Sequence, residues 1–365
     1  MTIYKELGSS DSVSTKTLLH EAIPLTGTIV SGTYGVENIK DYSHGMFQSV
    51  YDYPYLSSSA NHIFDITAGY AAESALSGTS AGHIQNSKKI NMYNQFAQVL
   101  LGYTGSNNDV RLFESDLTLD GVNKMKDVFI ISLSRLLVKD EIKKGSFTIS
   151  LGTGAYATPF DGTVTLGDYT ANANGTGVAN CDGGDYAILH TSSTANIGET
   201  GHGVIFYQAG VVVLTSSVFS ANTSGSAGDG LIDDFGSAHL NTAANLRPDQ
   251  TLVSSSISGA CNALRHRIEN IQFNNTTELN STIYFCRVNN SEFNYSANPT
   301  YLSTSSGGPS EIVIKDGSVS TDPHSYITTI GLYSADNELM AVAKLSEPLR
   351  KDPTNELTLR VRLDY

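Results

Sequence analysis

The sequence contains no tryptophan, only three cysteines and no apolar run long enough to cross a membrane. The cysteines, Cys181, Cys261 and Cys286, stand far apart and include no C-x-x-C pair, which gives no indication of a zinc site or a redox motif. We therefore expect them to be reduced and mostly buried. Because a helix needs about 20 consecutive apolar residues to span a bilayer, we expect no membrane insertion.

Positive charge is also scarce. The chain has 22 Lys and Arg against 36 Asp and Glu, a formal net charge of −14, and this field repels phosphate backbones. We therefore expect no nucleic-acid partner. The first residues, MTIYKELGSSDS, lack the basic start and apolar run of a secretory signal, so we expect synthesis and assembly in the cytoplasm.

What is present is a globular composition: 365 residues, 40% of them hydrophobic and 16% charged. Short apolar runs such as FTISL, YAILH and VVVL alternate with Gly, Asn, Ser and Thr stretches, the pattern of short strands joined by turns. The sequence predicts an α+β, mainly β fold: antiparallel sheets or a sandwich, a few short amphipathic helices and an inserted β-domain.

Two segments have helical periodicity. Apolar residues recur at three- and four-residue spacing in KKINMYNQFAQVLLG, which ends at Gly102. The same spacing occurs in SISGACNALRHRIENIQF. The predicted apolar stripes contain Ile90, Tyr93, Ala97, Leu100 and Leu101 in the first helix and Ile257, Ala260, Cys261, Leu264, Ile268 and Ile271 in the second.

Strands are expected at His62–Thr67 and Val128–Leu133, and near the C-terminus YITTIGLY and MAVAKL flank a turn at Ala335–Glu338, which predicts a hairpin. The last segment, residues 357–364, alternates strictly between apolar and polar side chains, which predicts a strand held in a sheet. We expect three parts: a mixed α/β part (1–145), an inserted Gly/Asn/Ser-rich β-domain (146–250), and a helix followed by an antiparallel β-domain (251–365).

The sequence offers no convincing catalytic, cofactor or metal site, so we expect no enzyme and no cofactor. Gly78-Thr-Ser80-Ala-Gly82 matches the nucleophile motif G-x-S-x-G, but no buried strand precedes it. Gly152-Thr-Gly154 lacks the third glycine of a dinucleotide-binding loop.

Metal-ligand patterns are similarly weak. Asp229, Asp233 and Asp234 share a Gly-rich loop, but their spacing is not that of an EF-hand, so we interpret them as a solvated loop with a structural ion as the alternative. His44, His62 and His324 are flanked by Tyr, Ser or Pro and are expected in packed loops.

Tyrosine is abundant, with 19 residues, and it suits protein interfaces because its ring gives a large, rigid contact area with a polar tip. Two Tyr-rich segments are therefore candidate interfaces, with closure of the protein's own core as the alternative. The candidate interface residues are Tyr51, Tyr53, Tyr55, Phe293, Tyr295 and Tyr301.

Three segments resemble known proteins: SVYDYPYLSSSANHIFDITAGY, STIYFCRVNNSEFNYSANPTY and the last 40 residues from YITTIGLY onward. They resemble virion structural proteins of contractile-tailed, myovirus-type bacteriophages, especially marine and cyanobacterial ones. The resemblance implies a baseplate wedge or tail component that is assembled in the host cytoplasm, resides in the virion and contacts other virion proteins. It also implies a homo-oligomer or multi-copy subunit.

Other functions remain open on sequence grounds. The chain is alternatively a neck, collar or head-surface decoration protein, or a receptor- or glycan-binding module of a tail fibre whose inserted β-domain binds the ligand. A hydrolase that degrades the host envelope would need an acidic pair or a triad gathered in a cleft.

Overall fold

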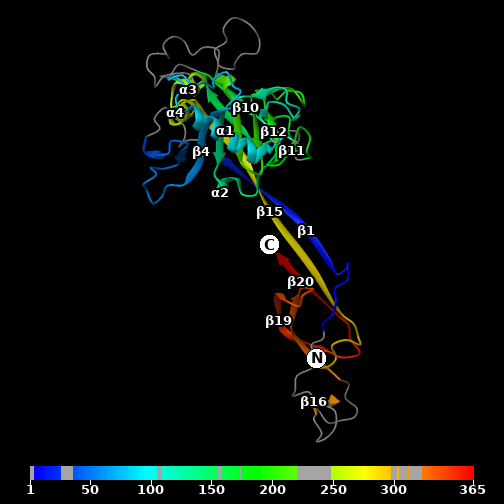
Figure 1. Cartoon of the computed structure of the whole chain (residues 1–365). Coiled ribbons are helices and arrows are strands. Elements are labelled where there is room, and N and C mark those ends of the chain that lie inside the picture. The colour runs from blue at the N-terminus through cyan, green and yellow to red at the C-terminus, as the bar shows by residue number, and fades with distance from the viewer. Residues whose placement is uncertain are drawn as a thin grey trace. The chain divides into compact units, whose positions relative to one another are not determined.

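The computed structural model describes residues 4–25, 36–104, 109–153, 158–172, 174–191, 193–219, 248–296, 302–303, 311–312 and 323–365. These residues form a mainly β structure with antiparallel sheets and few helices, as the sequence predicts (Figure 1). The chain divides into two compact units. The larger unit comprises residues 19–277, and the smaller unit comprises residues 1–18 and 278–365.

An eight-stranded antiparallel sheet is the centre of the larger unit. Its strands, in spatial order, are β11 (Ala179–Cys181), β12 (Gly184–Leu189), β13 (Gly203–Phe206), β14 (Val211–Thr215), β7 (Asp127–Leu133), β4 (His62–Tyr70), β3 (Gln48–Tyr51) and β2 (Ile39–Asp41). The predicted strands at His62–Thr67 and Val128–Leu133 are thus confirmed, and they pair with each other in the middle of this sheet.

Both faces of this sheet are covered, and strand β7 shows why its sequence is almost continuously apolar. Phe129 and Ile131 belong to one buried cluster, whereas Val128 and Ile130 belong to another. Successive side chains of a strand point to opposite faces, so these two clusters are the cores on the two sides of the sheet. Each fully buried side chain of this size contributes roughly 1.5–3 kcal/mol.

One core is closed by a second layer of strands and helices. Its strands are β9 (Thr148–Gly152), β10 (Thr163–Gly167) and the start of β15 (Ile268–Val288), which pair with one another in an antiparallel manner. Its helices are α3 (Pro248–Ser254) and α4 (Ile257–Arg265). Ile149, Leu166 and Ile271 lie in the same cluster as Phe129 and Ile131, so this part of the molecule is a sandwich.

The other core is closed mainly by helix α1 (Asn86–Leu101), which confirms the first predicted helix. Tyr93, Ala97 and Leu100 are buried against the sheet. Gly69 on β4 makes this packing possible, because a Cβ atom there would lie 2.5 Å from the carbonyl oxygen of Lys89. A glycine is therefore required where the helix backbone approaches the strand.

The second predicted helix is shorter than its apolar stripe. Helix α4 contains Ile257, Ala260, Cys261 and Leu264, all buried, but it ends at Arg265. Ile268 and Ile271, which we expected on the same helix, lie on strand β15 and remain in the same core. The prediction was wrong at this end because a spacing of three residues fits both a helix turn and a strand with a bulge, and the pairing with β9 shifts register between Ile268 and Asn270.

Helix α4 begins with a side-chain cap. The hydroxyl of Ser256 accepts a hydrogen bond from the backbone N–H of Gly259 at 3.1 Å. Substituting Ser256 with alanine leaves that N–H without its partner, so we expect the free energy of unfolding to fall by about 1 kcal/mol. Urea denaturation of the purified variant measures this, with the exposed Ser87→Ala as the control, expected to change stability by less than about 0.5 kcal/mol.

The boundaries expected at 145/146 and 250/251 both fall inside the larger unit. Strand β14 pairs with β7 along its whole length, from Val211↔Ser132 to Thr215↔Val128. Residues before 145 and after 146 therefore share one sheet. The remaining short elements of this unit are a 3-10 turn (Val36–Asn38), β5 (Phe113–Glu114), β6 (Lys124–Met125), α2 (Arg135–Val138), β8 (Glu141–Ile142) and a 3-10 turn (Ser216–Phe219).

The smaller unit contains the C-terminal part of β15, the start of β1 (Ser12–Pro24), and β20 (Leu357–Asp364), which pairs with β15 from Ser281↔Asp364 to Val288↔Leu357. It also contains the predicted hairpin, formed by β18 (Ser325–Tyr333) and β19 (Leu339–Lys351), and the short pair β16 (Leu302–Ser303) and β17 (Glu311–Ile312). The turn of the hairpin has Asn337 at a φ of 62°, a conformation that asparagine tolerates.

Candidate interaction surfaces

The first Tyr-rich segment follows strand β3 in the larger unit. Tyr51 is half-buried, whereas Tyr53 is 55% exposed and Tyr55 is 37% exposed. The side chain of Asp52 holds the segment by accepting hydrogen bonds from the backbone N–H of Asn61 at 2.6 Å and from its side-chain amide at 2.8 Å. Two of the three candidate tyrosines, Tyr53 and Tyr55, are therefore exposed on a loop that hydrogen bonds hold in place.

A second aromatic group lies on the connection between strands β2 and β3 and was not singled out from the sequence. Tyr42 stacks on His44 with ring centroids 5.1 Å apart and lies 4.8 Å from Phe47, while the Lys40 ammonium lies 4.9 Å from the Tyr42 ring centroid. The spacing D-Y-S-H-G-M-F between two short strands was the available signal.

A chain of hydrogen bonds joins the two aromatic groups. The Tyr42 hydroxyl lies 3.2 Å from the Ser49 hydroxyl, which donates to Asp65 at 2.5 Å, and His62 Nε2 lies 2.9 Å from the same carboxylate oxygen. The His62 ring in turn contacts Tyr51 at 5.6 Å. Because serine and histidine both bond to the aspartate and not to each other, this is not the arrangement of a catalytic triad. It fixes side chains at a surface.

The second Tyr-rich segment belongs to the smaller unit. Phe293 is half-buried with a φ of 56°, and its carbonyl oxygen accepts a hydrogen bond from the Ser325 hydroxyl at 2.5 Å. Tyr295 is 40% exposed. Tyr301, the remaining candidate, lies outside the described residues.

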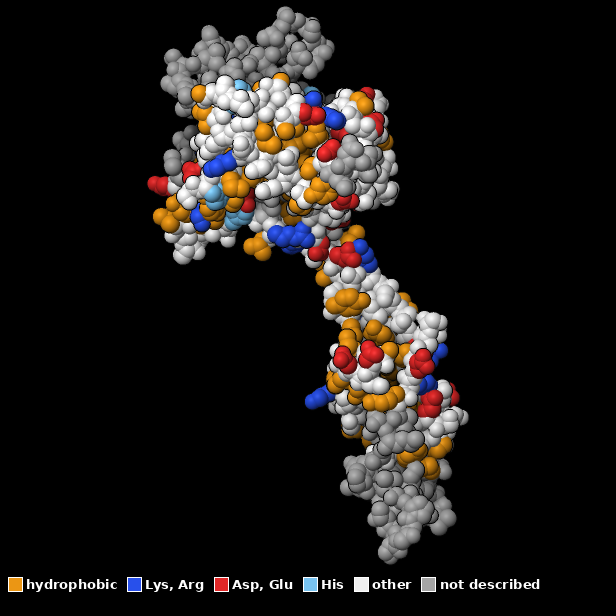
Figure 2. All heavy atoms as spheres, viewed as in Figure 1, with side chains coloured by type: hydrophobic (Ala, Val, Ile, Leu, Met, Phe, Trp, Pro, Cys, Tyr) orange, Lys and Arg blue, Asp and Glu red, His pale blue; other side chains and the backbone are white. Residues whose placement is uncertain are grey.

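Phe293 and Tyr295 line a groove of about 1510 Å³ that is formed within the smaller unit. Six tyrosines contribute to its walls: Tyr4, Tyr284, Tyr295, Tyr326, Tyr333 and Tyr365. The volume exceeds that of an ordinary small-molecule site, which is roughly 300–1000 Å³. Figure 2 shows apolar side chains gathered over the visible face of this unit.

The apolar residues of the smaller unit are poorly buried. Among its described residues, only Val288 and Val361 are apolar side chains with less than 9% of their surface exposed, whereas Tyr326, Met340 and Val342 are each more than half exposed. A unit of this size normally depends on a buried core. Exposed apolar surface of this kind is typical of interaction sites.

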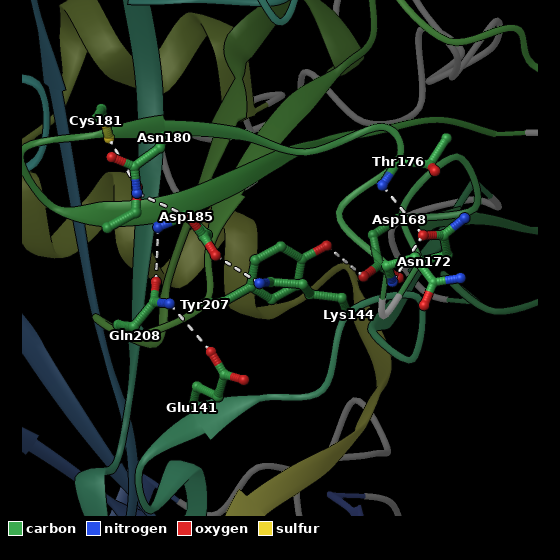
Figure 3. Close-up of polar contacts among 12 residues, drawn as sticks. Glu141, Lys144, Asp168, Asn172, Thr176, Asn180, Cys181, Asp185, Tyr207 and Gln208 are labelled. Atoms are coloured by element: carbon green, nitrogen blue, oxygen red, sulfur yellow. Dashed lines mark hydrogen bonds and ion pairs between the residues drawn. The ribbon is translucent and has the colours of Figure 1, made fainter.

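The larger unit contains a buried polar network that holds loops in place (Figure 3). The Asp168 carboxylate accepts hydrogen bonds from the N–H groups of Gly145 at 2.7 Å and Phe147 at 3.0 Å, and from the Tyr207 hydroxyl at 2.7 Å. Burial raises the pKa of Asp168 to about 6. The network joins the turn before β9 to the ends of β10 and β13.

A neighbouring part of this network joins strands β12 and β8. Lys144 pairs with Asp185 at 2.5 Å, and this contact lowers the pKa of that carboxyl. Gln208 accepts from the Asp185 backbone N–H at 2.7 Å and donates to Glu141 at 3.0 Å. Each of these polar groups forms a hydrogen bond or ion pair with another group of the protein, so the network stabilises the structure.

The G-x-S-x-G segment lies on an exposed connection that runs from Ala71 to Gln85, between β4 and α1. The Ser80 hydroxyl lies 2.6 Å from His83 Nδ1, and the His83 N–H donates to the Ser80 carbonyl oxygen at 3.0 Å. These contacts close one local turn. A nucleophile elbow instead places its serine on a sharp turn directly between strand and helix.

The acidic cluster of the Gly-rich loop, Asp229, Asp233 and Asp234, lies outside the described residues. Within the described ranges, no group of three or more His, Cys, Asp or Glu side chains is arranged to hold a metal ion. Rings of His44, His62 and His324 each contact an aromatic neighbour. The expectation of packed loops was wrong for His62, which begins strand β4, and for His44, which is exposed.

The three cysteines are free thiols, as expected, but only Cys261 is buried. Cys181 and Cys286 are half-buried, which corrects the expectation that most would be buried. Burial raises the pKa of all three thiols. They are therefore protonated at neutral pH and weak nucleophiles.

Comparison with protein-family models, curated proteins and solved structures found no match to this chain. No helix among the described residues combines the length and the apolar character needed to cross a bilayer.

Proposed function

We propose that this chain is a structural subunit of a tailed-phage virion, in the baseplate or the adjoining tail, and that it acts through protein-protein contacts. The observation that carries the proposal concerns the smaller unit. Its strands expose many apolar side chains, and very few apolar residues are buried among those that the structure describes. Such a unit gains its stability from neighbours, as subunits of permanent assemblies do.

The resemblance to myovirus virion proteins supports the same function, because its segments coincide with these surfaces. Residues 49–70 contain the exposed Tyr53 and Tyr55, and residues 281–301 contain Phe293 and Tyr295. Aromatic side chains on fastened loops are typical anchors of protein interfaces. The remaining segment contains the hairpin and the last strand, and Tyr326, Met340 and Val342 within it are each more than half exposed.

Analysis of the encoding phage tests this function. Virions are purified by density gradient, washed in high salt, and their proteins quantified by mass spectrometry. We expect the chain in washed particles at a fixed multiple-copy ratio to the tail sheath protein. Its presence only in the unassembled lysate fraction would contradict the proposal, and its loss during washing would place it outside the intrinsic structure.

A further inference from the structure

Among the described residues, strand β18 of the smaller unit pairs only with β19, in a two-stranded sheet. Its other edge has no partner strand within those residues, and we call it the free edge. The hydrogen bonds that fasten this hairpin include two near its open end: Ser325 to the Phe293 carbonyl oxygen at 2.5 Å, and Lys351 to Asn294 at 2.6 Å. A two-stranded hairpin is marginally stable by itself, so the free edge is where further strands add stability.

The composition of β18 differs from that of the other strands in this unit. SYITTIGLY contains neither a charged residue nor a proline, and most of its residues are β-branched or aromatic. Natural proteins protect solvent-exposed sheet edges with charge or proline. Strand β19 has Pro348 and four charged residues, and β20 has Arg360, Arg362 and Asp364, whereas β18 has no such protection.

The side chains of β18 also remain accessible. Tyr326 is 59% exposed and Tyr333 is 44% exposed, and Thr328 and Thr329 between them are exposed as well. An accessible strand that favours β pairing and has an open edge is a ready template for another strand.

We propose that the β18 strands of two copies of this chain pair edge to edge in antiparallel orientation, forming a four-stranded sheet in the order β19-β18-β18-β19. The occupant is a second copy because β18 is complementary to itself. A two-fold register centred on Thr329 sets uncharged side chains opposite one another, with Thr328 opposite Ile330, Ile327 opposite Gly331 and Tyr326 opposite Leu332.

The competing edge in this unit does not have this property. Any two-fold register of β20 that is centred on Arg360, Val361 or Arg362 places arginine opposite arginine. Like charges directly opposite on neighbouring strands are destabilising. Self-pairing is thus favoured at β18 and opposed at β20.

A charge-exchange experiment tests the pairing. Thr328 is exposed and lies at the irregularity between Ile327 and Thr329, where no β19 residue is paired with it. Thr328→Lys and Thr328→Glu each place like charges close together in the pair of strands. Sedimentation velocity of the full chain should show a wild-type dimer, twice the chain mass of 39.0 kDa, and loss of that dimer in each variant alone.

An equimolar mixture of the Lys and Glu variants should restore the dimer, because unlike charges then meet across the two strands. Val342→Lys is the matched control: it adds the same charge to an exposed position on β19, away from the pairing edge, and should leave the dimer intact. Circular dichroism verifies that each variant retains its strands.

A wild-type chain that remains monomeric over a wide concentration range overturns the proposal. A mixture of the Lys and Glu variants that fails to dimerise also overturns the proposal, and would assign the edge to a strand of another protein. An equal loss of dimer in Val342→Lys overturns it as well. The readout is the mass of the purified chain alone, so it is independent of whether the chain occurs in virions.

Discussion

Replacing Lys89 with methionine is expected to lower the free energy of unfolding by about 1–3 kcal/mol at neutral pH. Lys89 is fully buried on helix α1, and its ammonium donates to the carbonyl oxygens of Leu252 at 2.6 Å and Ser255 at 2.7 Å. These carbonyls belong to the C-terminal end of helix α3, where backbone acceptors have no partner within the helix. Methionine keeps most of the side-chain volume but leaves both acceptors unsatisfied.

The pH dependence identifies the charged group. Burial lowers the pKa of Lys89 from 10.5 to about 8. Between these values the unfolded chain binds more protons than the folded one, so the contribution of Lys89 rises with pH, by up to roughly 3 kcal/mol. The stability gap between wild type and Lys89→Met should therefore widen from pH 8 towards pH 10.

Lys88→Met is the matched control, because Lys88 is the neighbouring residue on α1 and is exposed. It should change stability by less than about 0.5 kcal/mol at every pH. Guanidinium denaturation at several pH values measures both variants. A Lys89→Met protein as stable as wild type, or a gap that narrows with pH, contradicts the assignment.

Asp168→Ala is expected to cost about 3–5 kcal/mol, which is enough to unfold a marginally stable protein. In the wild type, two backbone N–H groups and the Tyr207 hydroxyl donate hydrogen bonds to this carboxylate. The substitution leaves all three donors without an acceptor. Buried donors without acceptors cost their full desolvation penalty. The exposed Asp161→Ala serves as the control and should be nearly neutral.

Asp168→Asn separates charge from hydrogen bonding. Because burial raises the pKa of Asp168 from 3.8 to about 6, the folded chain binds more protons than the unfolded one between these values. Protonation of the buried carboxyl therefore favours the folded state: this part of the stability is fully present below pH 3.8 and is lost as pH rises through about 6, a change of about 2–3 kcal/mol, while the hydrogen bonds that Asp168 accepts remain. Thermal unfolding from pH 4 to 7 should show that slope in wild type and its loss in Asp168→Asn; identical slopes would contradict it.

Lys89 shows why sequence periodicity could not predict the buried hydrogen bonds of Lys89 and Asp168. Its position on α1 falls on the buried stripe with Tyr93 and Ala97, but lysine is buried only where it finds partners. Those partners are carbonyl oxygens 163 and 166 residues further along the chain. Asp168 likewise meets Tyr207 across 39 residues. Local patterns contain no information about such distant pairs.

Local signals were sufficient where neighbouring residues determine the structure. Alternation predicted β20, and the turn residues between Tyr333 and Leu339 predicted the β18–β19 hairpin. The division of the chain was harder to predict, because the paired residues of β14 and β7 are 79 or more positions apart and join segments of very different composition. A Gly- and Asn-rich texture identifies turns, but it does not determine which sheet the intervening strands enter.

Of the candidate surfaces, some were predicted from the sequence and one was not. Tyr53, Tyr55 and Tyr295 are exposed, and the sequence singled them out because aromatic residues are frequent in their two segments. The free edge of β18 was not foreseen, because an uncharged apolar strand is equally typical of a buried sheet interior. Only the arrangement of strands shows that SYITTIGLY has an open side.

A density map of the intact virion in which we propose that this chain resides is the most direct test of the structural role. We expect the chain to be traceable in the tail or baseplate, with Tyr326 and Tyr333 of the smaller unit buried against neighbouring chains. A complete map in which every protein density belongs to other chains, or in which this hairpin faces solvent on both sides, would contradict the account.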